Sequence, residues 1–124
     1  MKHLTLLILF ALTTLTAAAQ PSLRFDVRAK DLGAVSEKNG VASGTFTFTN
    51  TGDEPLVILK TETACKCTKA AYTKSPVMPG KTGTVTVAYN PRKQPQGAYF
   101  KTIRVFANTP EKQYVLTVKG TVRP

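Results

Sequence analysis

Histidine is almost absent from this chain of 124 residues, and tryptophan is absent altogether. The one histidine, His3, lies in an opening segment that we expect to be removed from the mature protein. Without an imidazole base, neither a Ser-His-Asp nor a Cys-His arrangement can form. We therefore predict that the protein is not an enzyme and that it has no catalytic residues.

Acidic residues are also few: seven, against 17 lysines and arginines, which gives a formal net charge of +10. The adjacent pair Asp53-Glu54 falls in an expected turn, whereas a glycosidase needs two carboxylates that face each other across a cleft. The basic balance favours anionic partners such as acidic proteins or polysaccharides. Because the lysines are spread along the chain without interleaved aromatics, no nucleic-acid partner is expected.

Apolar residues at helical spacing are missing after Ala19, and threonine, valine and aromatic residues alternate instead. The run 56–59 is expected to be buried on both faces, and the segment 61–71 is expected to be irregular. About seven strands separated by turn signals predict an all-β fold, an immunoglobulin-like antiparallel β-sandwich. The expected strands are 23–27, 31–35, 41–49, 56–59, 85–89, 99–107 and 113–122, with the last two paired as a hairpin.

The opening residues have the layout of a cleavable signal peptide. Lys2 and His3 form a basic start, residues 4–12 are apolar, and three alanines end at Ala19, the expected cleavage site. The apolar run is shorter than the ~20 residues that span a membrane. We therefore predict a signal peptide over 1–19 and a single domain over 20–124, periplasmic or secreted and not membrane-spanning after cleavage.

Two pairs of residues carry strong turn signals between the expected strands. Asn50 and Gly52 lie in one turn, and Pro79 and Gly80 lie in another. Glycine permits a positive φ at such positions, so we interpret all four as structural turn residues.

The only cysteines, Cys65 and Cys67, are the one chemical feature of the chain. In a strand their Cα atoms would lie about 6.6 Å apart, near the upper limit for a disulfide. Four interpretations stay open: a local structural pair, a redox pair activated by Lys60, Lys66 and Lys69, a soft-metal site for Cu(I) or zinc, and a bond to a partner. Two sulfurs are too few for a closed zinc site, so we predict neither a metal site nor a cofactor.

Five short motifs follow one another along the chain. They are Asp-Leu-Gly-Ala-Val at 31–35, Phe-Thr-Phe-Thr-Asn-Thr-Gly at 46–52, Pro-Leu-Val-Ile at 55–58, Cys-Lys-Cys-Thr at 65–68 and Pro-Gly-Lys at 79–81. Their order resembles the bacterial domain-of-unknown-function family fifteen-seventy-three, which is common in exported proteins of the Bacteroidetes. The resemblance covers about residues 25–122 and implies an immunoglobulin-like domain of the Hydin and major-sperm-protein type, without an established activity.

Together, these features predict a non-enzymatic binding or structural module of the cell envelope. It would act through sheet edges, loops or its basic surface on another envelope protein or an anionic polysaccharide. One alternative is a thiol-redox or copper-handling protein that uses Cys65 and Cys67. A second alternative is adhesion to an anionic polymer, which should weaken steeply with added salt.

Overall fold

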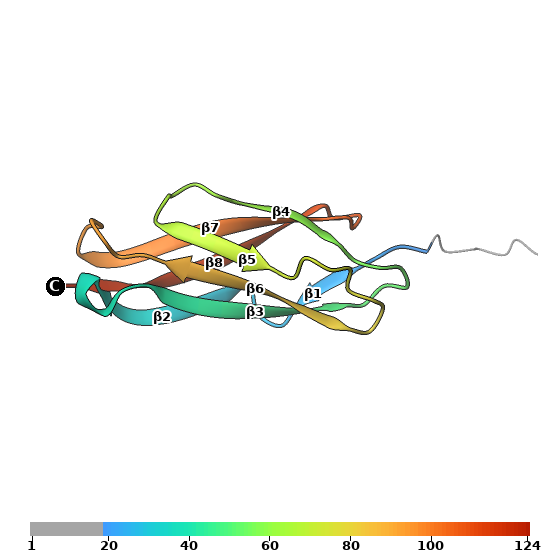
Figure 1. The fold of residues 1–124 in the computed structure, drawn as a ribbon, viewed down its shortest axis with the longest axis horizontal. Helices are drawn as coiled ribbons and strands as arrows, with labels where there is room; N and C mark the ends of the chain where they lie inside the picture. The colour runs from blue at the N-terminus through green and yellow to red at the C-terminus, as the bar shows by residue number, and fades with distance from the viewer. Residues whose placement is uncertain (1–18) are drawn as a thin grey trace, which may run out of the picture.

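The computed structural model describes residues 19–124, which form an elongated β-sandwich (Figure 1). Apart from Ala19, the expected signal peptide lies outside the described residues. The elements are β1 (Leu23–Phe25), β2 (Ala29–Ser36), the short 3₁₀ helix η1 (Glu37–Asn39), β3 (Ala42–Asn50), β4 (Ile58–Thr63), β5 (Thr68–Tyr72), β6 (Thr82–Tyr89), β7 (Gly97–Ala107) and β8 (Gln113–Arg123). No helix within residues 19–124 is long and apolar enough to cross a membrane.

The strands form two four-stranded sheets. Sheet A has the order β1-β3-β6-β5, and sheet B has the order β2-β8-β7-β4. This arrangement confirms the predicted immunoglobulin-like sandwich, and β7 and β8 form the predicted hairpin. One pair departs from the antiparallel expectation: β2 runs parallel to β8. The chain crosses from sheet A to sheet B between β1 and β2, and it then lies along β8 in the same direction.

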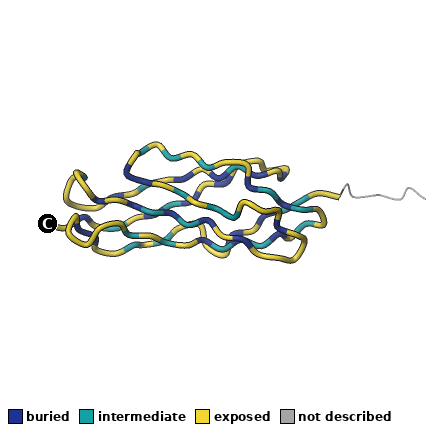
Figure 2. The backbone as a smooth tube through the Cα atoms, in the orientation of Figure 1, coloured by how far each residue is buried: buried dark blue, intermediate teal, exposed yellow. Residues whose placement is uncertain are grey.

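The core lies where the inward faces of the two sheets meet. The central strands contribute side chains that are fully buried, among them Phe46, Phe48, Val85, Val87, Ile103, Val105, Leu116 and Val118. Buried and exposed positions alternate along these strands, as the tube in Figure 2 shows. The alternation of threonine with apolar residues therefore correctly predicts which residues face the core.

Two local expectations are wrong. The run 56–59 is not buried on both faces: Leu56 and Ile58 are buried, whereas Leu59 is 59% exposed. The reason is that β4 is an edge strand of sheet B, and its register against β7 shifts between Ile58 and Lys60, which places Leu59 at an irregularity. The segment 61–71 is also more regular than expected, since it contains the end of β4 and most of β5.

Candidate functional site

The two cysteines lie in the loop that carries the chain from one sheet to the other. Strand β4, at the edge of sheet B, ends at Thr63, and β5, at the edge of sheet A, begins at Thr68. Within this crossover Cys65 and Cys67 are joined by a disulfide, with their Cα atoms 5.1 Å apart. This separation is shorter than the roughly 6.6 Å of an extended strand, so the bridge holds the crossover in a turn.

Hydrogen bonds tie this loop to the strands around it. The Thr68 N–H donates to the Cys65 carbonyl (3.2 Å), and the Thr63 hydroxyl donates to the Thr68 carbonyl (3.1 Å). The Asn90 N–H at the end of β6 donates to the Cys67 carbonyl (2.7 Å). These bonds connect the disulfide loop to the end of β4, to the start of β5 and to the end of β6.

The two sulfur-bearing residues have different surroundings. Cys67 is buried in an apolar cluster with Tyr89 and Tyr99, whose rings stack with centroids 3.9 Å apart, whereas Cys65 is partly exposed. The Tyr99 hydroxyl is buried and has no hydrogen-bond partner among the described residues. Burial, with smaller contributions from Tyr89 and Asp31, raises the pKa of Tyr99 to about 12. This phenol is therefore neutral at physiological pH and cannot serve as a base there.

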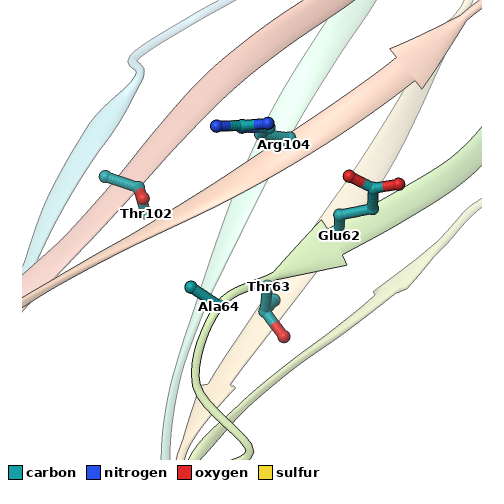
Figure 3. Close-up of a pocket in the computed structure, with 5 residues that line it drawn as sticks. All are labelled: Glu62, Thr63, Ala64, Thr102 and Arg104. Carbon is teal, nitrogen blue, oxygen red and sulfur yellow. The ribbon is translucent and has the colours of Figure 1, made fainter.

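Each half of the disulfide lines a hollow in the surface. Cys67 borders a pocket with Lys66, Asn90, Arg92, Lys93 and Gln94. Cys65 borders a second pocket with Ala64, Thr68, Phe100, Lys101 and Thr102. A third hollow adjoins the second: Glu62 and Thr63 at the end of β4 lie beside Thr102 and Arg104 of β7 (Figure 3). The disulfide thus lies between two surface hollows, and a basic loop lies on one side of it.

The family of the chain follows from its sequence as a whole. The family described as "Protein of unknown function (DUF1573)" matches residues 23–122. The chain belongs to the DUF1573 family. This confirms the resemblance expected from the five motifs, and it assigns no activity.

Solved structures share the fold of this DUF1573 domain. A protein of unknown function from Porphyromonas gingivalis W83 superposes with a TM-score of 0.74 at 18% identity, over 90% of this chain and 51% of that protein. The PapD-like domain 7 of human CEP192 gives 0.63 at 9% identity, over 84% and 87%. The periplasmic chaperone SfaE gives 0.55 at 13% identity, over 83% and 58%. These identities show the fold alone, and no curated protein matches the sequence.

The DUF1573 chain spans about half the length of the Porphyromonas protein. The match therefore assigns this chain neither an activity nor a partner.

The four turn residues predicted from the sequence lie at the opposite end of the sandwich from the disulfide. They are Asn50, Gly52, Pro79 and Gly80, and the register places Asn50 beyond the Thr49–Thr82 pair, whereas Thr68 pairs with Tyr89 at the other end of β6. Asn50 is fully buried, and its side-chain amide donates to the carbonyls of Glu54 (2.7 Å) and Val77 (2.9 Å). The structure does not bring these residues together with the cysteines.

The lysines expected to activate the cysteines do not all lie beside them. Lys66 lies beside Cys67, but Lys60 forms an ion pair with Glu62 (3.0 Å). The 91–97 loop supplies Arg92 and Lys93 to the same pocket, which sequence spacing could not show because they lie more than 20 residues further along the chain. Within residues 19–124, no group of three or more His, Cys, Asp or Glu side chains is placed to hold a metal ion.

Proposed function

We propose that this DUF1573 domain is a non-enzymatic binding module of the cell envelope, exported by its opening segment, that holds a partner polypeptide at the edge of sheet B. The observation that supports it is the exposure of two large apolar side chains on that side of the molecule. Leu59 on the edge strand β4 is 59% exposed, and Phe100 on β7 is 66% exposed. Exposed apolar residues beside strand edges are typical of interaction surfaces.

The charge and fold of the domain also support this proposal. A net charge of +10 favours association with acidic partners. The fold is shared with SfaE, a periplasmic chaperone, and with a Bacteroidetes protein from P. gingivalis. Export would place the domain in the compartment where such partners are found.

The test is affinity capture from the envelope fraction of the native cells, with the full chain immobilised after export. We expect saturable capture of the same protein at low salt, competed by free domain. Repeating the capture at high salt and after protease treatment separates a protein partner from an anionic polysaccharide, because only the protein is lost on proteolysis. Recovery of no protein at low salt, or of a polysaccharide alone, would contradict the proposal.

A second candidate function is thiol–disulfide exchange at Cys65 and Cys67. The supporting observation is that the bridge borders two surface pockets, with Arg92 and Lys93 beside Cys67. A thiolate of an external dithiol would attack one sulfur of the bridge, forming a mixed disulfide and releasing the other cysteine as a thiolate. The second thiol of the reagent then closes its own disulfide and leaves both cysteines reduced.

Thiol alkylation after equilibration with glutathione or dithiothreitol redox buffers tests this second candidate. A redox-active pair should be reduced by mild buffers, and the reduced protein should be assayed for bound copper at the same time. A bridge that resists mild reductants, in a protein that binds no copper, would leave only a structural role for the pair.

A further inference from the structure

Strand β7 has a neighbour on both sides for only part of its length. It pairs with β8 from Gly97 to Phe106, but with β4 only from Ile103 to Ala107. Figure 3 shows the β4 arrow ending at Thr63, while β7 continues past Thr102. The half of β7 that precedes Ile103 therefore forms an open edge inside sheet B.

Two hydrogen bonds at the β7–β8 hairpin show which backbone groups of β7 point towards the open edge. The Ala107 N–H donates to the Lys112 carbonyl on the β8 side, and the Asn108 N–H donates to the Val57 carbonyl on the β4 side. In an antiparallel ladder the direction alternates with each residue. The N–H and C=O groups of Ala98, Phe100 and Thr102 therefore point to the β4 side, where no pairing strand of the described chain reaches them.

The disulfide turn is what keeps β4 from covering these groups. If β4 continued in register, Ala64 would pair with Thr102 and Lys66 with Phe100. Instead the crossover turns towards sheet A, and the bridge holds Cys65 and Cys67 closer together than a strand allows. A hollow of about 280 Å³ lies in the vacated place, with Cys65 and Thr68 on one side and residues 100–102 on the other.

The edges at β1 and β2, and the start of β5, offer less to an added strand. Strand β1 has three residues, and β2 has a register shift between Asp31 and Ala34, where Gly33 adopts a positive φ. On β5 the backbone N–H of Thr68 already donates to the Cys65 carbonyl, and its C=O already accepts from the Thr63 hydroxyl. Natural sheets protect their edges by such short strands and bulges. The open part of β7 has neither.

The surroundings of this edge indicate the chemistry of its occupant. Phe100 is 66% exposed, so it offers an apolar neighbour to a side chain on an added strand. Lys101 lines the hollow, Lys119 lies opposite Phe100 on β8, and Arg104 lies further along β7. Two carboxylates lie near these cations: Glu62 is paired with Lys60 of its own strand, and Asp31 lines a hollow with Phe100 and Lys119. An extended segment that alternates apolar and acidic residues fits these surroundings.

We propose that the open edge of β7, residues 98–102, accepts an extended, acidic and apolar segment of an envelope protein as an added strand of sheet B. Main-chain hydrogen bonds to Ala98, Phe100 and Thr102 would supply the pairing, and the apolar contact with Phe100 would supply side-chain selectivity. The disulfide-bonded crossover directs the chain away from residues 98–102 and so leaves this part of β7 without a neighbouring strand. This inference rests on the proposed binding function and names its site and the class of its partner.

Capture by two matched variants tests the site. Phe100 and Val115 both point outward from central strands of sheet B and are both exposed, at 66% and 43%. We expect F100D to weaken capture of the envelope protein by about tenfold, because it removes the apolar contact and repels an acidic strand, while V115D stays close to wild type. Equal capture by all three proteins, or an equal loss in both variants, would overturn the inference but leave the proposed binding function standing. No capture by the wild type would instead contradict the proposed function.

Amide exchange measured by NMR tests strand addition directly, whatever the native partner is. The probe is a capped heptapeptide of alternating glutamate and valine, and the control carries N-methyl groups on the amides that would face β7. We expect the probe to slow exchange of the Ala98, Phe100 and Thr102 amides by about tenfold or more, while the methylated control does not. Protection at a different edge, equal effects of both peptides, or concentration-dependent protection without peptide would overturn the inference. The last of these would identify a second copy of the chain as the occupant.

Discussion

Replacing Asn50 with alanine should be among the most damaging single changes in this domain. The side chain is fully buried and makes two donor contacts, to the carbonyls of Glu54 (2.7 Å) and Val77 (2.9 Å). Its carbonyl oxygen accepts from the N–H groups of Gly52 (2.9 Å) and Ser22 (3.4 Å). It thus joins the end of β3 to the segment before β1, to its own turn and to the segment before β6.

The expected loss follows from the groups that the change leaves without partners. A buried polar group that loses its partner costs about 1–3 kcal/mol. The N–H groups of Ser22 and Gly52 lie in half-buried residues and lose their acceptor. The exposed Glu54 can be reached by water, and the Val77 carbonyl keeps the Leu56 N–H as a donor (2.9 Å). We therefore expect N50A to lower the free energy of unfolding by about 2–4 kcal/mol, which corresponds to roughly 10–25 °C in Tm for a domain of this size.

Asn108 provides the matched control. Its side chain makes a similar pair of contacts, accepting from the Val57 N–H (2.8 Å) and donating to the Pro55 carbonyl (3.2 Å), but it is exposed. Water can replace it, so N108A should cost about 1 kcal/mol or less. Guanidinium unfolding followed by circular dichroism measures both variants. A difference of less than about 1 kcal/mol between N50A and N108A would refute the reasoning from burial.

Three further changes test other parts of the structure. In G83A, the new methyl group would lie 2.9–3.0 Å from ring atoms of the buried Phe48, so stability should fall by about 1–3 kcal/mol, and an unchanged Tm would contradict this packing. Y99F removes a buried hydroxyl that has no partner among the described residues and should raise stability by about 1–2 kcal/mol in thermal melts. Folding raises the pKa of Tyr99 from its ordinary 10.0 to about 12, so the unfolded chain deprotonates at a lower pH than the folded one. The free energy of unfolding of the wild type should therefore fall by at most about 3 kcal/mol as the pH rises from about 10 to 12, and that of Y99F should fall by less. The double variant C65S/C67S opens a loop of only three residues, so it should lose about 1.6 kcal/mol and still fold, and failure to fold by circular dichroism would count against a local role for the bridge.

Some features of this protein could be predicted from local sequence because their cause is local. The alternation of threonine with apolar residues determines which side chains of β3 and β6 face the core, because successive side chains of a strand point to opposite faces. The β7–β8 hairpin likewise pairs neighbouring segments across a short turn. The turn signal at Asn50 was visible too, but its bond to Val77 spans 27 residues and was not.

What only the tertiary structure decided is which strand lies beside which. The exposure of Leu59 follows from the place of β4 at a sheet edge, and the parallel pairing of β2 follows from a crossing between the two sheets. The open edge of β7 exists because the Cys65–Cys67 turn diverts a neighbour that is more than 30 residues away in sequence. By itself, the sequence determined which side chains of each strand face the core, because side chains alternate between the two faces within each segment. The edges depend on contacts between distant segments, and those contacts arise only when the whole chain has folded.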